Sequence, residues 1–326
     1  MPALQRIAFL AALAAGGLAA PAISYADQTF PTKPLRIVVP FTPGGTSDVL
    51  ARLIGIKLSE SWGQPVVIEN RTGAGGTIGA GIVAKATPDG HTLLISSAAF
   101  TISAALHADN LPYDPIKDFA GVTRLGFSTT ALIVHPSLGV RSVKELVEMG
   151  KAKPGHLITA HAGAGSSTHM NAERFRLAAG IKIKQVGFKG AADAMLEVIS
   201  GRVHYGLLGL ASSMPYIQDG KLIAVAVGTP ERSKLLPDVP TIAETLPGFA
   251  RDGSHSMLAP AGTPRPVLLK ISGEVKRIFE MPDIKQRVQA FDFHPAPSTP
   301  EEHDRILRAD IETFAGVVRV AGLRGR

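Results

Sequence analysis

Two glycine-rich segments carry the residue types that most clearly predict chemistry. The first loop, residues 40–48, reads Pro-Phe-Thr-Pro-Gly-Gly-Thr-Ser-Asp, and the second loop, residues 163–169, reads Gly-Ala-Gly-Ser-Ser-Thr-His. Each leaves an apolar run and enters a helical pattern. A helix N-terminus offers unpaired N–H groups and about half a positive charge, and glycine lets a ligand approach the backbone. The pattern predicts two anion sites, with ordinary capping by Thr46, Ser47 and Ser166 as the alternative.

Other chemistries fit these segments poorly. Neither loop has the Gly-Lys-Ser/Thr of a phosphate-binding P-loop or a complete dinucleotide fingerprint. Ser166 and His169 are three residues apart, but no Gly-x-Ser-x-Gly elbow or third triad member is visible, so a serine hydrolase is the least favoured alternative. The chain has no cysteine, and no His, Asp and Glu spacing typical of a metal site. We therefore expect no enzyme activity, no cofactor and no metal.

Alternating strands and helices must position the two loops. Apolar runs at 35–39, 63–70 and 91–97 predict strands, and Thr46 to Glu60 has a helical apolar stripe. The alternation restarts near residue 129. We expect strands at 129–137, 182–190, 203–209 and 221–228, a strand, loop and helix over 157–180, and helices at 142–155, 192–201, 265–280 and 300–320. This order predicts two α/β lobes, with the C-terminal helices returning to the first.

The N-terminus has the pattern of a secretory signal. Arg6 is the only charged residue before Ala26, and 14 apolar or small residues at 7–20 precede Ser24 and Ala26. We expect cleavage after Ala26 and a periplasmic mature chain, with a membrane anchor as the alternative. The formal net charge is +7, but the basic residues are scattered. A scattered charge on an exported chain favours an anionic small molecule over nucleic acid.

The chain also resembles a known family in the order of its motifs. The matching segments are LRIVVPFTPGGTSDVLARLIG, WGQPVVIENRTGAGGTIGA, LPYDPIKDFAGVT, GAGSSTHMNAERF, GFKGAADAMLEVISGRV, LLPDVPTIAET and LAPAGTPRPV. Together they span essentially the whole mature chain, and they resemble the Bug-type receptors of tripartite tricarboxylate transporters. The resemblance implies a type II periplasmic-binding-protein fold, with two α/β lobes around a ligand cleft. The implied boundaries are a signal peptide at 1–26, lobe I at 27–127 plus 250–326, and lobe II at 128–249.

The resemblance also implies which residues bind the ligand. Both loops should hold one carboxylate of a small organic acid, partly through ordered water, with the glycines leaving N–H groups open and the hydroxyls adding donors. Ser97 should face the cleft, Thr129 and Thr130 should begin a strand of lobe II, and Lys189 and Gly190 should add a contact. The expected ligand-binding residues are Phe41, Thr42, Gly44, Gly45, Thr46, Asp48, Ser97, Thr129, Gly165, Ser166, Ser167, His169, Lys189, Gly190 and Asp193.

Some of these residues have a second interpretation. A carboxylate repels an anion, so Asp48 is expected to fix its loop or to orient a water rather than touch the ligand. His169 is either a donor to the ligand or a residue that supports the helix cap. Lys189 either pairs with a second ligand carboxylate or is a solvated strand end, and Asp193 would suit an amino group. Ser254-His255 stands where the family commonly has an aromatic residue, which leaves the ligand's identity open.

The function that follows is capture of an organic carboxylate, such as an aromatic or a dicarboxylic acid, by a monomeric receptor that closes by hinge motion. The closed form is expected to dock on the membrane permease of a tripartite tricarboxylate-type transporter. A sensor subunit that presents the bound acid to a membrane signalling receptor is the alternative.

Overall fold

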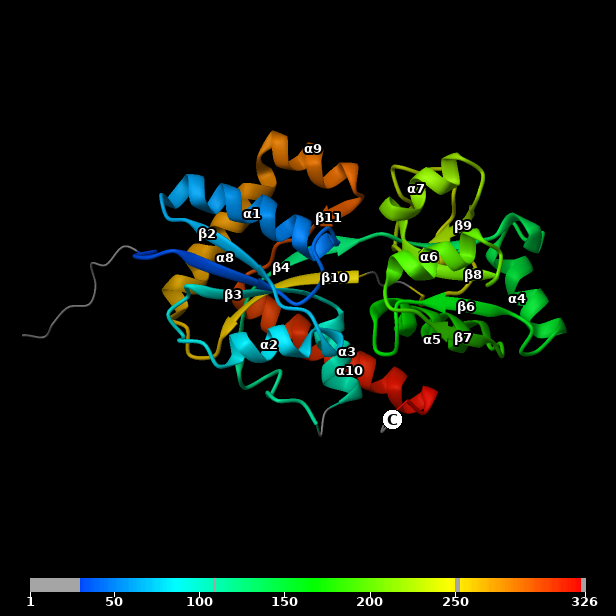
Figure 1. Cartoon of the computed structure of the whole chain (residues 1–326), viewed down its shortest axis with the longest axis horizontal. Coiled ribbons are helices and arrows are strands. Elements are labelled where there is room, and N and C mark those ends of the chain that lie inside the picture. The colour runs from blue at the N-terminus through cyan, green and yellow to red at the C-terminus, as the bar shows by residue number, and fades with distance from the viewer. Residues whose placement is uncertain (1–29, 108–109, 250–252, 324–326) are drawn as a thin grey trace, which may run out of the picture.

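Two separate β-sheets organise the chain, with helices on both faces of each (Figure 1). The computed structural model describes residues 30–107, 110–249 and 253–323. The predicted signal peptide and the predicted boundary at residue 250 lie outside these residues, and the other predicted boundaries stay predictions. In this description, lobe I is the body built on the six-stranded sheet and lobe II is the body built on the five-stranded sheet.

Lobe I has the strand order β11-β4-β10-β3-β1-β2. Its strands are β1 Leu35–Val39, β2 Val66–Asn70, β3 Thr92–Ser97, β4 Phe119–Ser128, β10 Gly253–Pro260 and β11 Phe293–Pro295. Its helices are α1 Thr46–Trp62, α2 Thr77–Ala84, α3 Ala99–Leu106, α8 Arg265–Glu280, α9 Pro282–Ala290 and α10 Pro300–Ala321. β1 runs parallel to β2 and β3, whereas β10 is antiparallel to both β3 and β4.

Lobe II has the strand order β7-β6-β8-β5-β9. Its strands are β5 Thr130–Val134, β6 Ile158–His161, β7 Lys184–Gly187, β8 Tyr205–Gly209 and β9 Ile223–Val227. Its helices are α4 Val143–Ala152, α5 Ser167–Ala179, α6 Ala191–Ile199 and α7 Leu210–Gln218. β6 is parallel to β7 and β8, so the second loop, which follows β6, leaves the sheet at the edge where parallel strands end.

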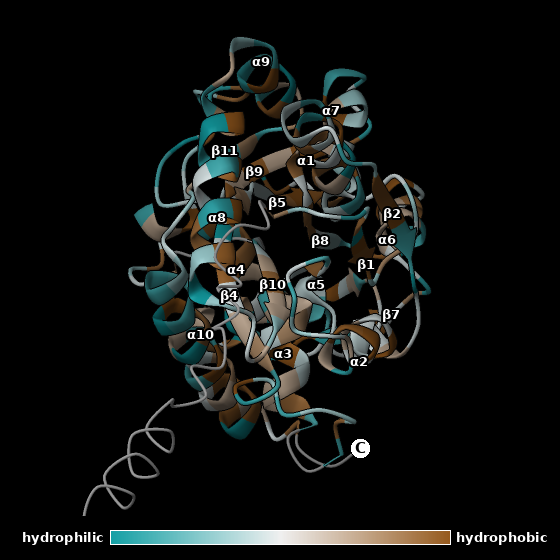
Figure 2. Ribbon diagram, turned by 90° about the vertical axis from the view of Figure 1, so that its left-hand side faces the viewer, coloured by the Kyte–Doolittle hydropathy of each residue, from teal (hydrophilic) through white to brown (hydrophobic). Residues whose placement is uncertain are grey.

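The C-terminal helices belong to lobe I, as the sequence predicts. α8 buries Leu268, Ile271, Val275 and Ile278, which recur every three or four residues and pack against the sheet with α1. α10 begins with a capping box in which the Thr299 hydroxyl accepts from the Glu302 N–H at 3.2 Å. Both helices show one hydrophilic and one hydrophobic side (Figure 2). Within the described residues, no helix is long and apolar enough to cross a membrane.

An apolar contact also joins the lobes away from the sheets. Met170 of α5 lies in one buried cluster with Ala98, Ile102 and Ala105 at and after the start of α3, and with Phe314 and Val318 of α10. Met170 is the lobe II member of this buried set, and its side chain is fully buried. α5 therefore rests on two helices of lobe I.

A polar network ties lobe I to the chain segments that run between the lobes. Thr129 alone separates β4 from β5, and its N–H donates to the Asp292 carbonyl at 3.3 Å. The Ser233 hydroxyl, which follows β9 in lobe II, donates to Asp292 Oδ2 at 2.9 Å, and both side chains are buried. His294 Nε2 lies 3.1 Å from Thr129 Oγ1 and 3.5 Å from Asp292 Oδ1. One turn of lobe I thus bonds to the connection after β4 and to the segment after β9.

We expect Asp292→Asn to lower the free energy of unfolding by about 1–2 kcal/mol, because the buried Ser233 hydroxyl loses a charged acceptor. Asparagine is the informative change, since Asp292 has φ +50°, a conformation that asparagine tolerates and alanine does not. Urea denaturation measures the loss. Asp219→Asn, at an exposed pair with Lys221, is the matched control and should change stability by less than about 0.5 kcal/mol. Equal stability of the two variants would contradict a structural role for the network.

Candidate functional site

The first loop places the N-terminus of α1 at the end of β1. Gly44 has φ +86°, and Gly45 is the N-cap residue with extended backbone and no side-chain cap. Thr42, Gly44 and Gly45 are exposed, and Thr46 is half-buried as the first residue of the helix. Among the described contacts, the N–H groups of Gly45, Thr46 and Ser47 have no acceptor, as expected for the first residues of a helix. Three backbone donors are thus left at the start of α1.

Asp48 fixes this loop from inside. Its Oδ2 accepts from the Gly44 N–H at 2.9 Å and from Arg52 Nε at 3.0 Å, and its Oδ1 accepts from Asn70 Nδ2 at 2.9 Å. Asn70 also donates to the Phe41 carbonyl. Burial alone would raise the pKa of Asp48, but the hydrogen bonds from Arg52, Gly44 and Asn70 outweigh burial and lower the pKa. The carboxylate therefore stays charged and ties both ends of the loop together.

The second loop is built in the same way at the start of α5. Gly165 has φ +75°, and its N–H donates to Nδ1 of His169 at 3.2 Å, four residues on. Because Nδ1 accepts, the neutral ring carries its proton on Nε2. Ser166 is the N-cap residue: its hydroxyl accepts from the His169 N–H at 3.2 Å and donates to the Gly163 carbonyl at 2.7 Å. The capping interpretation of Ser166 is therefore correct.

These bonds correct one expectation about the glycines. The N–H groups of Gly44 and Gly165 are not open, because each donates to a side chain four residues later. In the first turn of α5, the N–H groups of Ser167 and Thr168 have no acceptor among the described contacts. The open donors thus lie one to three residues after each glycine, within the first turn of each helix, where the helix dipole favours an anion.

Two imidazole rings lie next to each other at the second loop, tilted by 34°. The rings of His161 and His169 have centroids 4.4 Å apart, and both side chains are buried. Burial lowers the pKa of His161 to about 4, with a further contribution from the positive charge that His169 would carry. Burial also lowers the pKa of His169. Both rings are therefore neutral near pH 7, which keeps Nδ1 of His169 available as the acceptor for Gly165.

The remaining predicted residues are spread over the edges of both sheets. Ser97 ends β3, and its hydroxyl accepts from the Ala99 N–H at 3.3 Å, so it supports the start of α3. Thr129 is buried in the interlobe network, where its hydroxyl lies 3.1 Å from His294 Nε2. Lys189 and Asp193 are exposed, and Gly190 is the N-cap residue of α6. The Phe188 carbonyl lies 3.2 Å from the place where a Gly163 Cβ would stand, so this segment borders the second loop.

The structure gives no support to a Ser166–His169 catalytic pair. The Ser166 hydroxyl bonds to the Gly163 carbonyl, the Thr168 hydroxyl and a backbone N–H. In the described part of the chain, no hydrogen bond joins this hydroxyl to the His169 ring, whose Nδ1 accepts from Gly165. The described residues also contain no group of three His, Cys, Asp or Glu side chains placed to hold a metal ion.

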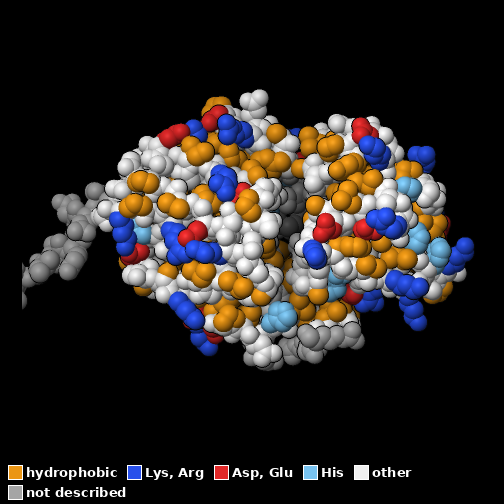
Figure 3. All heavy atoms as spheres, viewed as in Figure 1, with side chains coloured by type: hydrophobic (Ala, Val, Ile, Leu, Met, Phe, Trp, Pro, Cys, Tyr) orange, Lys and Arg blue, Asp and Glu red, His pale blue; other side chains and the backbone are white. Residues whose placement is uncertain are grey.

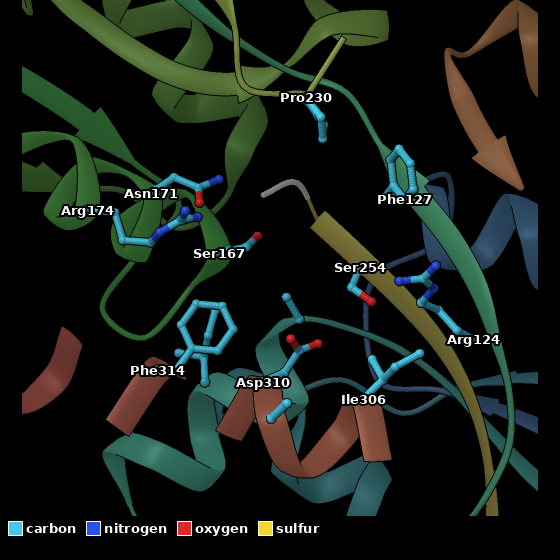
Figure 4. A pocket seen from close by; sticks show the side chains of 13 residues that line it. Arg124, Phe127, Ser167, Asn171, Arg174, Pro230, Ser254, Ile306, Asp310 and Phe314 are labelled. Atoms are coloured by element: carbon cyan, nitrogen blue, oxygen red, sulfur yellow. The ribbon is translucent and has the colours of Figure 1, made fainter. Parts of the chain in front are cut away.

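The space between the lobes includes a cavity of about 280 Å³ that the sequence did not reveal (Figure 4). The space-filling view shows the groove between the two lobes (Figure 3). Apart from Ser167, none of the predicted residues lines the cavity. The residues that sequence reasoning missed are Ala98, Ile102, Arg124, Phe127, Asn171, Arg174, Pro230, Ser254, Ile306, Ala309, Asp310 and Phe314. The one signal in the sequence was Ser254-His255, which departs from the pattern of the family.

His255 occupies the opposite side of β10 from this cavity. Its Nδ1 lies 3.1 Å from the Ser47 hydroxyl in the first turn of α1, and its Nε2 lies 3.5 Å from the Ser128 hydroxyl. Burial lowers the pKa of His255 to about 4. The neutral ring therefore joins α1, β10 and β4 at the edge of lobe I that faces lobe II.

Two α/β lobes with helix N-termini at the facing sheet edges define a solute-binding protein of the periplasmic type. The chain belongs to the receptor family of tripartite tricarboxylate transporters, because the model described as "Tripartite tricarboxylate transporter family receptor" matches residues 50–323. Protein BugT of Bordetella pertussis is 32% identical over 314 residues, which cover 96% of this chain and 95% of BugT.

Solved structures agree with this assignment. R. palustris Rpa4515 with adipate is 33% identical, has a TM-score of 0.82, and covers 90% of this chain and 99% of its own. MatC from Rhodopseudomonas palustris with bound malate is 31% identical, has a TM-score of 0.76, and covers 89% and 100% of the two chains. The predicted family and fold are thus confirmed, and proteins of this fold and family bind carboxylates.

Proposed function

We propose that this chain is an exported receptor that captures a small organic carboxylate between its lobes and delivers it, as a monomer, to the permease of a tripartite tricarboxylate-type transporter. The observation that carries the proposal is the matched construction of the two loops. In each loop the glycine N–H donates to a side chain four residues later, and N–H groups in the first turn of the helix that follows have no acceptor among the described contacts. The adipate and malate bound by relatives support a carboxylate as the ligand.

The proposed mechanism uses no covalent chemistry. The anion meets the first turns of α1 and α5, whose N–H groups and dipoles favour negative charge without a paired cation. Because the loops belong to different lobes, an anion that contacts both holds the lobes together and shifts the population toward the closed form. The residues proposed to contact it remain those predicted from the sequence, with Gly45, Thr46 and Ser167 nearest to the open donors.

A thermal-shift screen against organic acids, with adipate and malate included, tests the proposal. A ligand at 100 times its dissociation constant adds about 2.7 kcal/mol of apparent stability, so a binder raises the melting temperature by several degrees. Amines and sugars of similar size serve as negative controls. If no carboxylate in a broad panel stabilises the protein while another class does, the proposal is wrong.

Ser166→Ala is expected to weaken carboxylate binding by about 1 kcal/mol or more, because the cap sets the direction of the open N–H groups. It also costs about 1 kcal/mol of stability, since Ser166 is an N-cap. Ser142 of α4 is the matched control: its hydroxyl accepts from the Glu145 N–H at the same 3.2 Å. Calorimetric titration of folded Ser142→Ala should give wild-type affinity at a similar loss of stability. Equal affinity in both variants contradicts the site at α5.

A further inference from the structure

His255 lies between the first turn of α1 and the place where the chain passes from lobe I to lobe II. The residue is 5% exposed, and its Nδ1 lies 3.1 Å from the Ser47 hydroxyl. Its Nε2 lies 3.5 Å from the hydroxyl of Ser128, the last residue of β4. The N–H of Ser47 is one of the open donors at the start of α1. One ring thus contacts the proposed binding end of α1 and the end of the strand that leads out of lobe I.

The neighbours of His255 fix the direction of its ring. On β10, His255 pairs with Ser97 of β3 and with Gly126 of β4. The ring of Phe293 meets it edge-on, with the two centroids 5.8 Å apart. Gly126 leaves room for Phe293, because a Cβ at residue 126 would lie 2.9 Å from the Phe293 Cζ. The imidazole is therefore held in place between the two serine hydroxyls.

Ser128 lies directly beside the connection between the lobes. The next residue, Thr129, alone separates β4 from β5, and its N–H donates to the Asp292 carbonyl. Asp292 in turn directly precedes Phe293, whose ring contacts His255. Hinge motions are absorbed by a few residues at the ends of elements. A rotation of lobe II about this connection therefore changes the position of the Ser128 hydroxyl relative to the imidazole.

A neutral imidazole links the roles of its two partners. One ring nitrogen carries the proton and donates, and the other accepts. When one serine hydroxyl donates to the ring, the other must accept from it. Hydrogen bonds in such a chain strengthen one another, so a change at Ser128 alters the bond to Ser47.

We propose that His255 is a positioning residue that couples the connection between the lobes to the first turn of α1. The inference rests on the proposed function and deepens it, because it states how closure of the lobes acts on the carboxylate site. As the lobes close, the Ser128 hydroxyl approaches the ring, and the ring holds Ser47 more tightly. The open N–H of Ser47 is then fixed in the direction of the anion.

A double-mutant cycle tests this coupling. Ser47→Ala removes one partner of the ring, Ser128→Ala removes the other, and the double variant lacks both. Each single variant should weaken carboxylate binding fivefold or more. The measurement is isothermal titration calorimetry with the acid that stabilises the wild-type chain most in the thermal-shift panel, beginning with adipate and malate. Because both changes break the same chain of bonds, the double variant should bind within twofold of the weaker single variant, whereas independent effects would multiply to about 25-fold.

Two further variants separate this coupling from a local or general role of the ring. In His255→Asn, the amide can take the place of Nδ1 beside Ser47 but is too short to reach Ser128, so this variant should bind as weakly as Ser128→Ala. Ser272→Ala is the matched control. Ser272 is a buried serine of α8 in lobe I, and its hydroxyl donates to the Leu269 carbonyl at 3.1 Å. The control should keep wild-type affinity.

The results distinguish the coupling from the underlying function. Wild-type affinity in Ser128→Ala or His255→Asn, or losses that multiply in the double variant, would overturn the coupling and leave the proposed function standing. An equal loss in Ser272→Ala would assign the effect to a general weakening of lobe I and would also overturn it. If no carboxylate of the panel binds the wild-type chain, the proposed function and the coupling are both wrong.

Discussion

Lowering the pH from 7 to 5 should remove about 4–6 kcal/mol from the free energy of unfolding, mainly through three buried histidines. Burial lowers the pKa of His161 and His255 to about 4 and that of His303 to about 3, the last with a contribution from nearby Arg124. In the unfolded chain these rings take up protons near pH 6.5. Between pH 6.5 and 4 the unfolded chain thus binds more protons, so stability falls as the pH falls.

The magnitude follows from the linkage between pKa and stability. For each histidine that stays neutral in the folded protein at pH 5, the free energy of unfolding is about 2 kcal/mol lower at pH 5 than at pH 7, because one pKa unit corresponds to about 1.4 kcal/mol. Native domains are stable by about 5–15 kcal/mol, so the loss is a large part of the total. Urea denaturation at half-unit pH steps measures it, and the steepest decline should lie between pH 6.5 and 4.

His303 offers the sharpest variant for this prediction. Its side chain is fully buried, and within the described structure neither ring nitrogen has a hydrogen-bond partner. His303→Leu should therefore raise stability, by about 2 kcal/mol more at pH 5 than at pH 7. His107→Asn, at an exposed position after α3, should leave the pH profile unchanged. A wild-type profile that is flat between pH 6.5 and 5 would contradict the argument.

Asp48→Asn should be the most damaging conservative change at the first loop, lowering stability by about 2 kcal/mol and carboxylate affinity at least tenfold. The amide has the size of the original side chain but not its negative charge. The charged carboxylate is the group that accepts from Arg52, Asn70 and the Gly44 N–H. Hydrogen bonds to charged groups contribute about 1.5–3 kcal/mol each when partly buried. Because Arg52 is half exposed, most of the loss should come from Gly44 and Asn70.

The affinity effect has a different origin from the stability effect. Without the charged acceptor, the backbone at Gly44 is free to turn, and the open N–H groups of Thr46 and Ser47 lose their common direction. Asp283→Asn is the control, since Asp283 is also an acid in the first turn of a helix but forms an exposed pair with Lys57. It should change both quantities by less than about 0.5 kcal/mol. Wild-type affinity in a folded Asp48→Asn protein would contradict the role of the first loop in carboxylate binding.

Much of the fold was predictable wherever apolar periodicity is strong. The helix expected at 265–280 is α8, whose apolar residues recur every three or four positions. The elements that were not predicted include β4, β10, β11, α3, α7 and α9. In β4, Gly121 and Gly126 interrupt the apolar pattern. Only glycine fits at residue 126, because φ is +143° and a Cβ there would lie 2.1 Å from the His294 carbonyl oxygen. That requirement comes from β11, far along the chain, so no local pattern could reveal it.

The candidate site also has parts that the sequence could predict and parts that it could not. The two loops could be predicted because glycines, hydroxyl residues and a helix start are adjacent in sequence. The cavity could not, because its lining comes from β4, α5 and α10, which lie far apart in the sequence. The role of His169 as an acceptor for Gly165 could also be found only in the structure, since the sequence allows either ring nitrogen to face the loop.

The two glycine anchors differ in chemistry, so acid acts on them in different ways. Gly44 is held by a carboxylate that stays ionised well into acid, whereas Gly165 is held by an imidazole nitrogen that a single proton occupies. A charge on His169 also repels one on the neighbouring ring of His161. A proton on Nδ1 of His169 therefore removes the acceptor for the Gly165 N–H, whereas Asp48 stays charged and keeps its bond to Gly44 down to a pH below the usual range of an aspartate.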